Sequence, residues 1–144
     1  HGIRAGTENV AGIVGMATAL QEHIEHLQQE TEYLNVLSNR LVDQLKLKDL
    51  DFHMNGSRHR IPGSLSLSFK GADGEMLLHR LDLMGTAIAT GSACDSKDAV
   101  LSHVIRAIAV PQEFAYGTIR VTLGMDNTPD QIDRIAHQIS TILC

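Results

Sequence analysis

The first third of the chain carries the hydrophobic repeat of an α-helix. Between Glu8 and about Lys46 no proline interrupts the sequence, and apolar residues recur at intervals of three, four or their sum, which places them on one helical face. An unbroken helix of this length measures about 55–60 Å, more than a small domain is wide, so we expect it to bend or to extend along a partner domain. We expect one buried stripe, formed by Ile13, Ala17, Leu20, Ile24, Leu27, Leu34, Leu41 and Leu45.

A coiled coil is the alternative explanation of this repeat. Thr31 and Ser38 fall where the seam would need apolar residues, and the run covers only about five heptads. The pattern therefore favours a single helix with one buried stripe.

Shorter elements follow the long helix. The strict alternation of Ser64–Phe69 predicts a strand with one apolar face. Two further strands are expected, over Thr86–Thr90 and around Val121. The apolar positions of the first and last of these strands are Leu65, Leu67, Phe69, Ile119, Val121 and Leu123.

Capping residues predict two short helices between these strands. Asp73 is suited to cap the first, which carries several leucines, and Gly85 is suited to end it. The second runs from Ser102 to about Ala109 and stops before a proline.

The last helix opens with a capping box in which Pro129 follows Thr128 and Gln131 completes the box. Its apolar face consists of Ile132, Ile135, Ala136, Ile139 and Leu143. We therefore predict an α+β, two-layer fold. A small, largely antiparallel sheet of three or four strands is packed with helices and preceded by one long helix over about 8–46.

Composition and charge exclude several classes of protein. Apolar residues make up 43% and charged residues 20% of the 144 residues, as in a folded globular domain. The net charge is −5 and the 12 Lys and Arg are scattered, which does not fit a nucleic-acid-binding protein. The sequence has neither a membrane-length apolar run of about 20 residues nor a signal peptide at its start, so we expect a cytoplasmic protein.

The chain begins at His1 without a methionine, and its first residues resemble the middle of a loop. We therefore expect a fragment of a longer protein. Its two cysteines, Cys94 and Cys144, do not suggest a disulfide framework.

Three residues are candidates for chemistry. Cys94 follows Gly-Ser-Ala in a small, flexible turn; it is either an exposed nucleophilic thiol or a buried apolar filler. Arg120 lies on the strand face opposite the apolar residues; it either clamps a carboxylate or is a solvated surface residue. Thr7, at the start of the long helix, either donates to a phosphate or serves as an N-cap.

Metal and phosphate-loop chemistry find little support. Only His23 and His26 share a helical face, and two ligands do not make a metal site, so we expect no metal. His103 is placed to approach the Cys94 thiol, but an ordinary helix-surface histidine is the better interpretation. The glycine turn at 71–74 lacks the ending of a phosphate loop.

Four stretches, taken together and in this order, resemble the C-terminal part of the PLP-dependent cysteine desulfurases of the class V aminotransferase fold. They are Arg4-Ala5-Gly6-Thr7-Glu8-Asn9-Val10, Gly91-Ser92-Ala93-Cys94, Ser102-His103-Val104-Ile105-Arg106-Ala107-Ile108 and Ile119-Arg120-Val121-Thr122-Leu123-Gly124. The similarity covers essentially the whole chain and implies that residues 1–144 form the small domain of such an enzyme.

The resemblance implies a role for each candidate. Cys94 would take sulfur from L-cysteine as a persulfide, leaving L-alanine, with PLP as the electron sink. Arg120 would bind the substrate α-carboxylate, and Thr7 would donate to the PLP phosphate in the partner subunit of a homodimer. The stretch 94–102 resembles the longer loop of group I enzymes, which delivers sulfur to an iron–sulfur scaffold or a thiolation protein. The Schiff-base lysine of the family would lie upstream of His1, so we expect the chain alone to be inactive.

Three alternatives remain open. A selenocysteine lyase shares the fold. A non-catalytic sulfur-relay module would hold Cys94 on a loop and bind no cofactor, which would account for the missing lysine. Another class V enzyme would use no thiol, and Cys94 would then be incidental.

Overall fold

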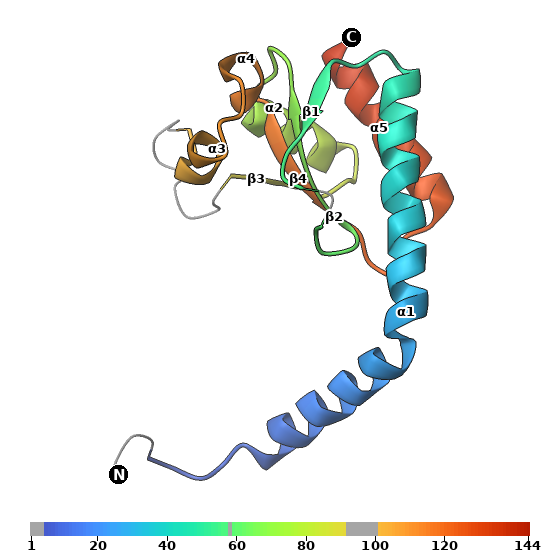
Figure 1. The fold of residues 1–144 in the computed structure, drawn as a ribbon, viewed down its shortest axis with the longest axis vertical. Coiled ribbons are helices and arrows are strands. Elements are labelled where there is room, and N and C mark those ends of the chain that lie inside the picture. The colour runs from blue at the N-terminus through green and yellow to red at the C-terminus, as the bar shows by residue number, and fades with distance from the viewer. Residues whose placement is uncertain (1–4, 58, 92–100) are drawn as a thin grey trace.

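The computed structural model describes residues 5–57, 59–91 and 101–144, which form a mixed α/β unit with a projecting N-terminal helix (Figure 1). The elements, in chain order, are α1 (Val10–Leu47), β1 (Phe52–Met54), β2 (Ser64–Phe69), α2 (Gly74–Leu83), β3 (Ala89–Thr90), α3 (His103–Ala107), α4 (Gln112–Ala115), β4 (Thr118–Thr122) and α5 (Pro129–Leu143). No helix among these residues is long and apolar enough to cross a bilayer.

The sheet has the strand order β1-β2-β4-β3, and every neighbouring pair is antiparallel. In the central pair, Leu65 lies opposite Val121 and Ser66 opposite Arg120. Because successive side chains point to opposite faces of a sheet, this register gathers apolar residues on one face and polar residues on the other. The prediction of a small antiparallel sheet is confirmed.

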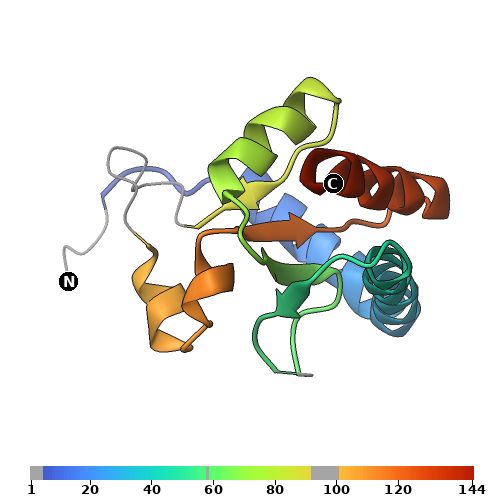
Figure 2. The same cartoon turned by 90° about the horizontal axis from the view of Figure 1, so that it is seen from above.

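Helices α1, α2 and α5 lie on one side of this sheet, and the short helices α3 and α4 lie on the other (Figure 2). The side with three helices encloses the core. The buried apolar residues of that core are Leu37, Leu41, Leu45, Leu65, Leu67, Phe69, Leu77, Leu81, Ile119, Val121, Leu123, Ile132, Ile135, Ala136 and Ile139.

The long predicted helix is present as α1, and it bends along its length (Figure 1). The prediction of one buried stripe is wrong for its N-terminal half, where Leu20 and Ile24 are 59% and 63% exposed. Only the C-terminal half packs on the core, with Leu41 and Leu45 fully buried. The physical reason is that the first half extends away from the sheet, so none of the other described elements covers it.

The strand expected over Thr86–Thr90 is shorter than predicted, because β3 is only Ala89–Thr90. The start of that stretch instead ends α2. Gly85 has φ +77°, and the Thr86 N–H donates to the Leu81 carbonyl oxygen at 2.9 Å, as in a helix that terminates through a left-handed glycine.

The other differences are small. Helix α3 ends at Ala107, before the predicted end at Ala109, and Ala109 itself has φ +53°. The sequence interpretation did not identify β1 or α4. The N-cap of α2 at Asp73 and the capping box of α5 are confirmed.

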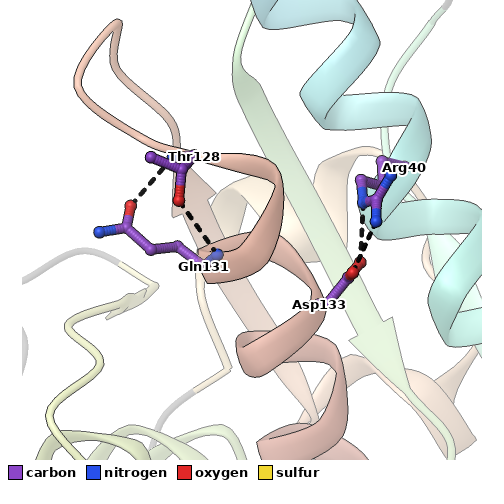
Figure 3. A network of polar contacts seen from close by, with 4 residues as sticks. All are labelled: Arg40, Thr128, Gln131 and Asp133. Carbon is purple, nitrogen blue, oxygen red and sulfur yellow. Dashed lines mark hydrogen bonds and ion pairs between the residues drawn. The ribbon is translucent and has the colours of Figure 1, made fainter.

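Polar contacts between α1 and the α5 region supplement the core (Figure 3). Arg40 donates to the two carboxylate oxygens of Asp133 at 2.8 and 2.6 Å. The Tyr33 hydroxyl donates to the Asn127 carbonyl oxygen at 2.6 Å. Hydrogen bonds from Arg40 hold the pKa of the Asp133 carboxyl below its ordinary value. The packed half of α1 is therefore fixed to α5 by directional contacts as well as by apolar packing.

This pKa shift predicts a pH-dependent contribution to stability. The depressed folded-state pKa means that the ionised carboxylate stabilises the fold above the unfolded-state pKa, at about pH 4, and that this contribution is lost as the pH falls through the folded-state pKa. Asp133→Asn should therefore lower the free energy of unfolding at about pH 7, and the difference from the parent should shrink towards about pH 3. Urea denaturation at both pH values measures this.

The matched control is Asp126→Asn, because the Asp126 carboxylate has no hydrogen bond or ion pair within the described ranges. An equal loss in the two variants, or a loss in Asp133→Asn that is the same at both pH values, would contradict the prediction.

The backbone at Gly117 passes close to the backbone of Phe69, so a side chain added at Gly117 should lower the stability of the fold. A Cβ at Gly117 would lie 2.2 Å from the Phe69 carbonyl oxygen, so the chain must shift to accept any side chain. We expect Gly117→Ala to cost about 3 kcal/mol of unfolding free energy through overpacking. Gly124→Ala serves as the control, because a Cβ there meets nothing within 4 Å. Equal stabilities of the two variants in chemical denaturation would refute this.

Candidate functional site

The candidate site lies on the polar face of the sheet. This face is formed by alternate residues of β2 and β4, namely Ser64, Ser66, Ser68, Thr118, Arg120 and Thr122. The core residues of the same strands alternate with them and point to the helices. Hydrophobic alternation therefore fixes which face is available for polar chemistry.

Arg120 is the only cationic side chain that β2 and β4 contribute to this face. As alternation predicted, it lies on the face opposite the apolar residues; it is exposed and lies opposite Ser66 of β2 and Ala89 of β3. Its guanidinium has no hydrogen bond or ion pair with the residues that the structure describes. An unpaired guanidinium on a strand can bind a planar anion through two parallel hydrogen bonds.

The described residues that flank the segment with Cys94 lie near each other just after β3. Cys94 itself lies outside the described residues. A Cβ built on Gly91, the last described residue before the segment, would lie 3.8 Å from the Cβ of Ser102. Gly91 and Ser102, which flank the segment, therefore lie close together; we call this place the loop base.

Both sides of the loop base are held by hydrogen bonds. The Thr90 hydroxyl, at the end of β3, donates to the Glu75 carboxylate of α2 at 2.5 Å. Ser102 caps α3, because its hydroxyl oxygen accepts from the Val104 N–H at 3.3 Å. Since Ala89 pairs with Arg120, the strand that leads into the loop base lies directly beside the arginine.

Thr7 is not brought to this site within the chain. It precedes α1, whose N-terminal end lies away from the sheet (Figure 1). The alternative role of Thr7 as N-cap of the long helix is wrong, because the cap is Asn9, whose side-chain oxygen accepts from the Gly12 N–H at 3.0 Å. The phosphate-binding role of Thr7 stays a prediction.

A buried hydrogen-bonded chain supports the polar face beside Arg120. The Asn55 side-chain NH₂ donates to the Ser68 hydroxyl at 2.8 Å and to the Ser66 hydroxyl at 3.0 Å. Ser68 and Thr118 are joined hydroxyl to hydroxyl at 2.7 Å, and Thr118 donates to the Ala115 carbonyl oxygen at 2.7 Å. The sequence interpretation missed this chain; its one local signal was the Ser-x-Ser-x-Ser alternation of β2.

The described lysines do not fit a PLP site. Such a site needs an amine that can lose its proton, whereas the Lys70 amine lies 3.2 Å from an Asp51 oxygen and 3.5 Å from a Glu113 oxygen. These contacts, the hydrogen bond to Asp51 first, raise the pKa of Lys70 above its ordinary value. Lys46 and Lys48 lie at the C-terminal end of α1, away from the polar face. The described residues therefore provide no Schiff-base lysine.

The described histidines do not form a metal site. His23 contacts Glu30 at 3.1 Å and not His26, and His103 is exposed at the start of α3. No group of three metal-ligating side chains is found within residues 5–57, 59–91 and 101–144.

The model of the family "Aminotransferase class-V" matches residues 1–135. The chain therefore belongs to the class V aminotransferase family. A curated relative named cysteine desulfurase IscS, from Dictyoglomus turgidum, is 41% identical over 147 residues that cover 96% of this chain and 37% of that protein. Cysteine desulfurase NifS of Azotobacter vinelandii is 33% identical, covering 99% of this chain and 36% of that protein.

Solved structures agree with this assignment. A structure titled "NIFS-LIKE PROTEIN" superposes with a TM-score of 0.81 at 31% identity, covering 99% of this chain and 35% of that chain. The NifS-like protein from Rickettsia africae has the same fold, with a TM-score of 0.80 at 24% identity and coverage of 97% of this chain and 36% of that one. The chain thus spans a little over a third of the length of these proteins.

The buried chain through Ser68 predicts a measurable loss of stability. Ser68→Ala leaves a buried Asn55 N–H without its acceptor and removes the donor to Thr118, which should cost about 1–3 kcal/mol of unfolding free energy. Ser64→Ala is the matched control on the same strand, because the Ser64 hydroxyl makes no hydrogen bond among the described residues. If the two variants unfold at the same denaturant concentration, the chain does not stabilise the fold.

Proposed function

We propose that residues 1–144 are the C-terminal small domain of a PLP-dependent cysteine desulfurase. This enzyme would remove sulfur from L-cysteine, giving L-alanine and a persulfide on Cys94. The observation that carries the proposal is the Arg120 guanidinium, which has no hydrogen bond or ion pair among the described residues and lies beside the loop base. Membership of the class V aminotransferase family, with relatives named cysteine desulfurase, supports it.

Arg120 would hold the α-carboxylate of L-cysteine. The planar guanidinium matches the two carboxylate oxygens in geometry. Its position on β4, a strand paired on both sides, gives it a rigid backbone. A substrate held by its carboxylate keeps its side-chain sulfur in a restricted region.

Cys94 would supply the nucleophile. Cys94 is the third residue after Gly91, so it lies at most about 11 Å from Gly91 when the chain is fully extended. Because Gly91 follows the strand paired with β4, this short tether favours a thiol that works on the same side of the domain as Arg120.

The sulfur transfer needs no oxidant or reductant other than the substrate and the thiol. The Cys94 thiolate attacks the substrate sulfur, the substrate Cβ–S bond breaks, and the electron pair of that bond remains with the carbon. Protonation of this carbon gives L-alanine, while Cys94 holds the sulfur as a persulfide. Bound PLP would accept electrons during the cleavage.

PLP, the Schiff-base lysine and the rest of the cofactor site would come from a domain outside this chain, so the chain alone would be inactive. Thr7 would donate to the PLP phosphate of the partner subunit in a homodimer. A group I type loop would pass sulfur to an acceptor such as an iron–sulfur scaffold protein in the cytoplasm.

Two other functions use the same family fold. A selenocysteine lyase differs in substrate preference, so turnover of cysteine and selenocysteine by one preparation distinguishes the two enzymes. A sulfur-relay module without cofactor would show no absorbance of bound PLP in the longer protein. Neither has a specific observation in its favour that the desulfurase lacks.

The deciding experiment is Cys94→Ala in the full-length enzyme. Persulfide formation should be abolished, because the attacking sulfur is gone, while the PLP absorbance should be unchanged. Cys144→Ala is the control, since Cys144 is an exposed thiol at the end of α5. Normal release of sulfide and alanine by the Cys94 variant would refute the proposal.

A further inference from the structure

The hydrogen-bonded chain behind the polar face has only one possible direction. A carbonyl oxygen only accepts, so Thr118 must give its single hydroxyl proton to Ala115 at 2.7 Å. The Thr118 oxygen then accepts from Ser68, the hydroxyl 2.7 Å away. Ser68 has therefore used its own proton, and its oxygen must accept from Asn55 at 2.8 Å.

This direction fixes the orientation of the Asn55 amide. Turning the amide over would place its oxygen against Ser68, two acceptors with no proton between them. The NH₂ group therefore faces the serines, and its second hydrogen goes to the Ser66 oxygen at 3.0 Å. The amide oxygen of Asn55 is buried and has no hydrogen-bond partner among the described residues.

The orientation of the Asn55 amide restricts the direction in which the Ser66 hydroxyl can donate. Its oxygen accepts from Asn55, so its hydroxyl proton cannot point back to the amide. Within the described ranges no other hydrogen bond involves this hydroxyl. Ser66 is half-buried and lies directly opposite Arg120 in the β2–β4 register. Opposed residues of antiparallel strands share a face and have Cα atoms about 4.5–5.5 Å apart.

We infer that Ser66 is a second donor for the carboxylate that Arg120 binds, and so a residue that sets the preference for α-carboxylate substrates. This inference rests on the proposed function. A carboxylate oxygen that accepts from the guanidinium still has a free lone pair. That lone pair can accept a hydrogen bond from the Ser66 hydroxyl. Asn55 holds that hydroxyl in the donating orientation before the substrate arrives, as preorganised recognition requires.

The test compares Ser66→Thr with Ser66→Val in the full-length enzyme, because these two side chains have nearly the same shape and differ in the hydroxyl. Ser66→Val should raise the KM for L-cysteine about tenfold, the factor that one hydrogen bond to a charged group supplies. It should change kcat less. Ser66→Thr should restore the parent KM.

Two further measurements separate recognition from structure. The KM for L-cysteine methyl ester, which has no carboxylate, should rise much less in Ser66→Val, so discrimination between the acid and the ester should fall. The affinity of Ser66→Val for L-alanine, measured by calorimetry, should fall by about the same factor as its KM for L-cysteine rises. Ser64→Ala is the matched control, since Ser64 lies on the same strand and face, opposite Thr122.

The outcomes distinguish the two proposals. If Arg120→Lys raises the KM while Ser66→Val matches the parent, the role of Ser66 is refuted and the desulfurase stands. Equal effects on the acid and the ester also refute it, because they indicate only a structural role. If the parent does not turn over L-cysteine, or Arg120→Lys leaves its KM unchanged, the proposed function itself is overturned.

Discussion

The antiparallel pairing of β2 with β4 is the contact on which the rest of the structure depends. Five residue pairs in one register place Leu65 and Leu67 against Val121 and Ile119 on the core side. The same register places Ser66 against Arg120 on the other side. A slip of β4 by one residue would turn its side chains to the opposite face, burying Arg120 and exposing Ile119 and Val121. Core burial therefore fixes the position of the candidate binding residue.

Local signals in the sequence predicted the elements that depend on local chemistry. The capping box at Thr128 and the N-cap at Asp73 each act within a few residues, so both were identified correctly. Strand β2 was recognisable because its alternation is complete. Strand β1 was not, because its three residues are ordered through pairing with β2, and no propensity in so short a segment reveals that pairing.

Contacts between segments that are far apart in the chain could not be predicted from the sequence. The face occupied by Arg120 followed from alternation, but its neighbour Ser66 is set by the register between two strands, in which residues 66 and 120 lie opposite each other. The same holds for Asn55, whose amide reaches residues 11 and 13 positions away. The apolar repeat of α1 correctly indicated a helix. Periodicity identifies the apolar face of a helix, but it does not identify which part of the protein, or which partner, packs against that face.

Because Gly91 and Ser102 lie close together, the architecture of the domain does not depend on the length of the segment between them. A connection whose ends already lie close together can gain residues at a small entropic cost, about 0.6 kcal/mol for each doubling of its length. The sheet and helices need not adjust when this happens. If Cys94 carries sulfur as we propose, insertion or deletion in this segment alone would change the distance over which the thiol can deliver it, while the rest of the scaffold stayed constant.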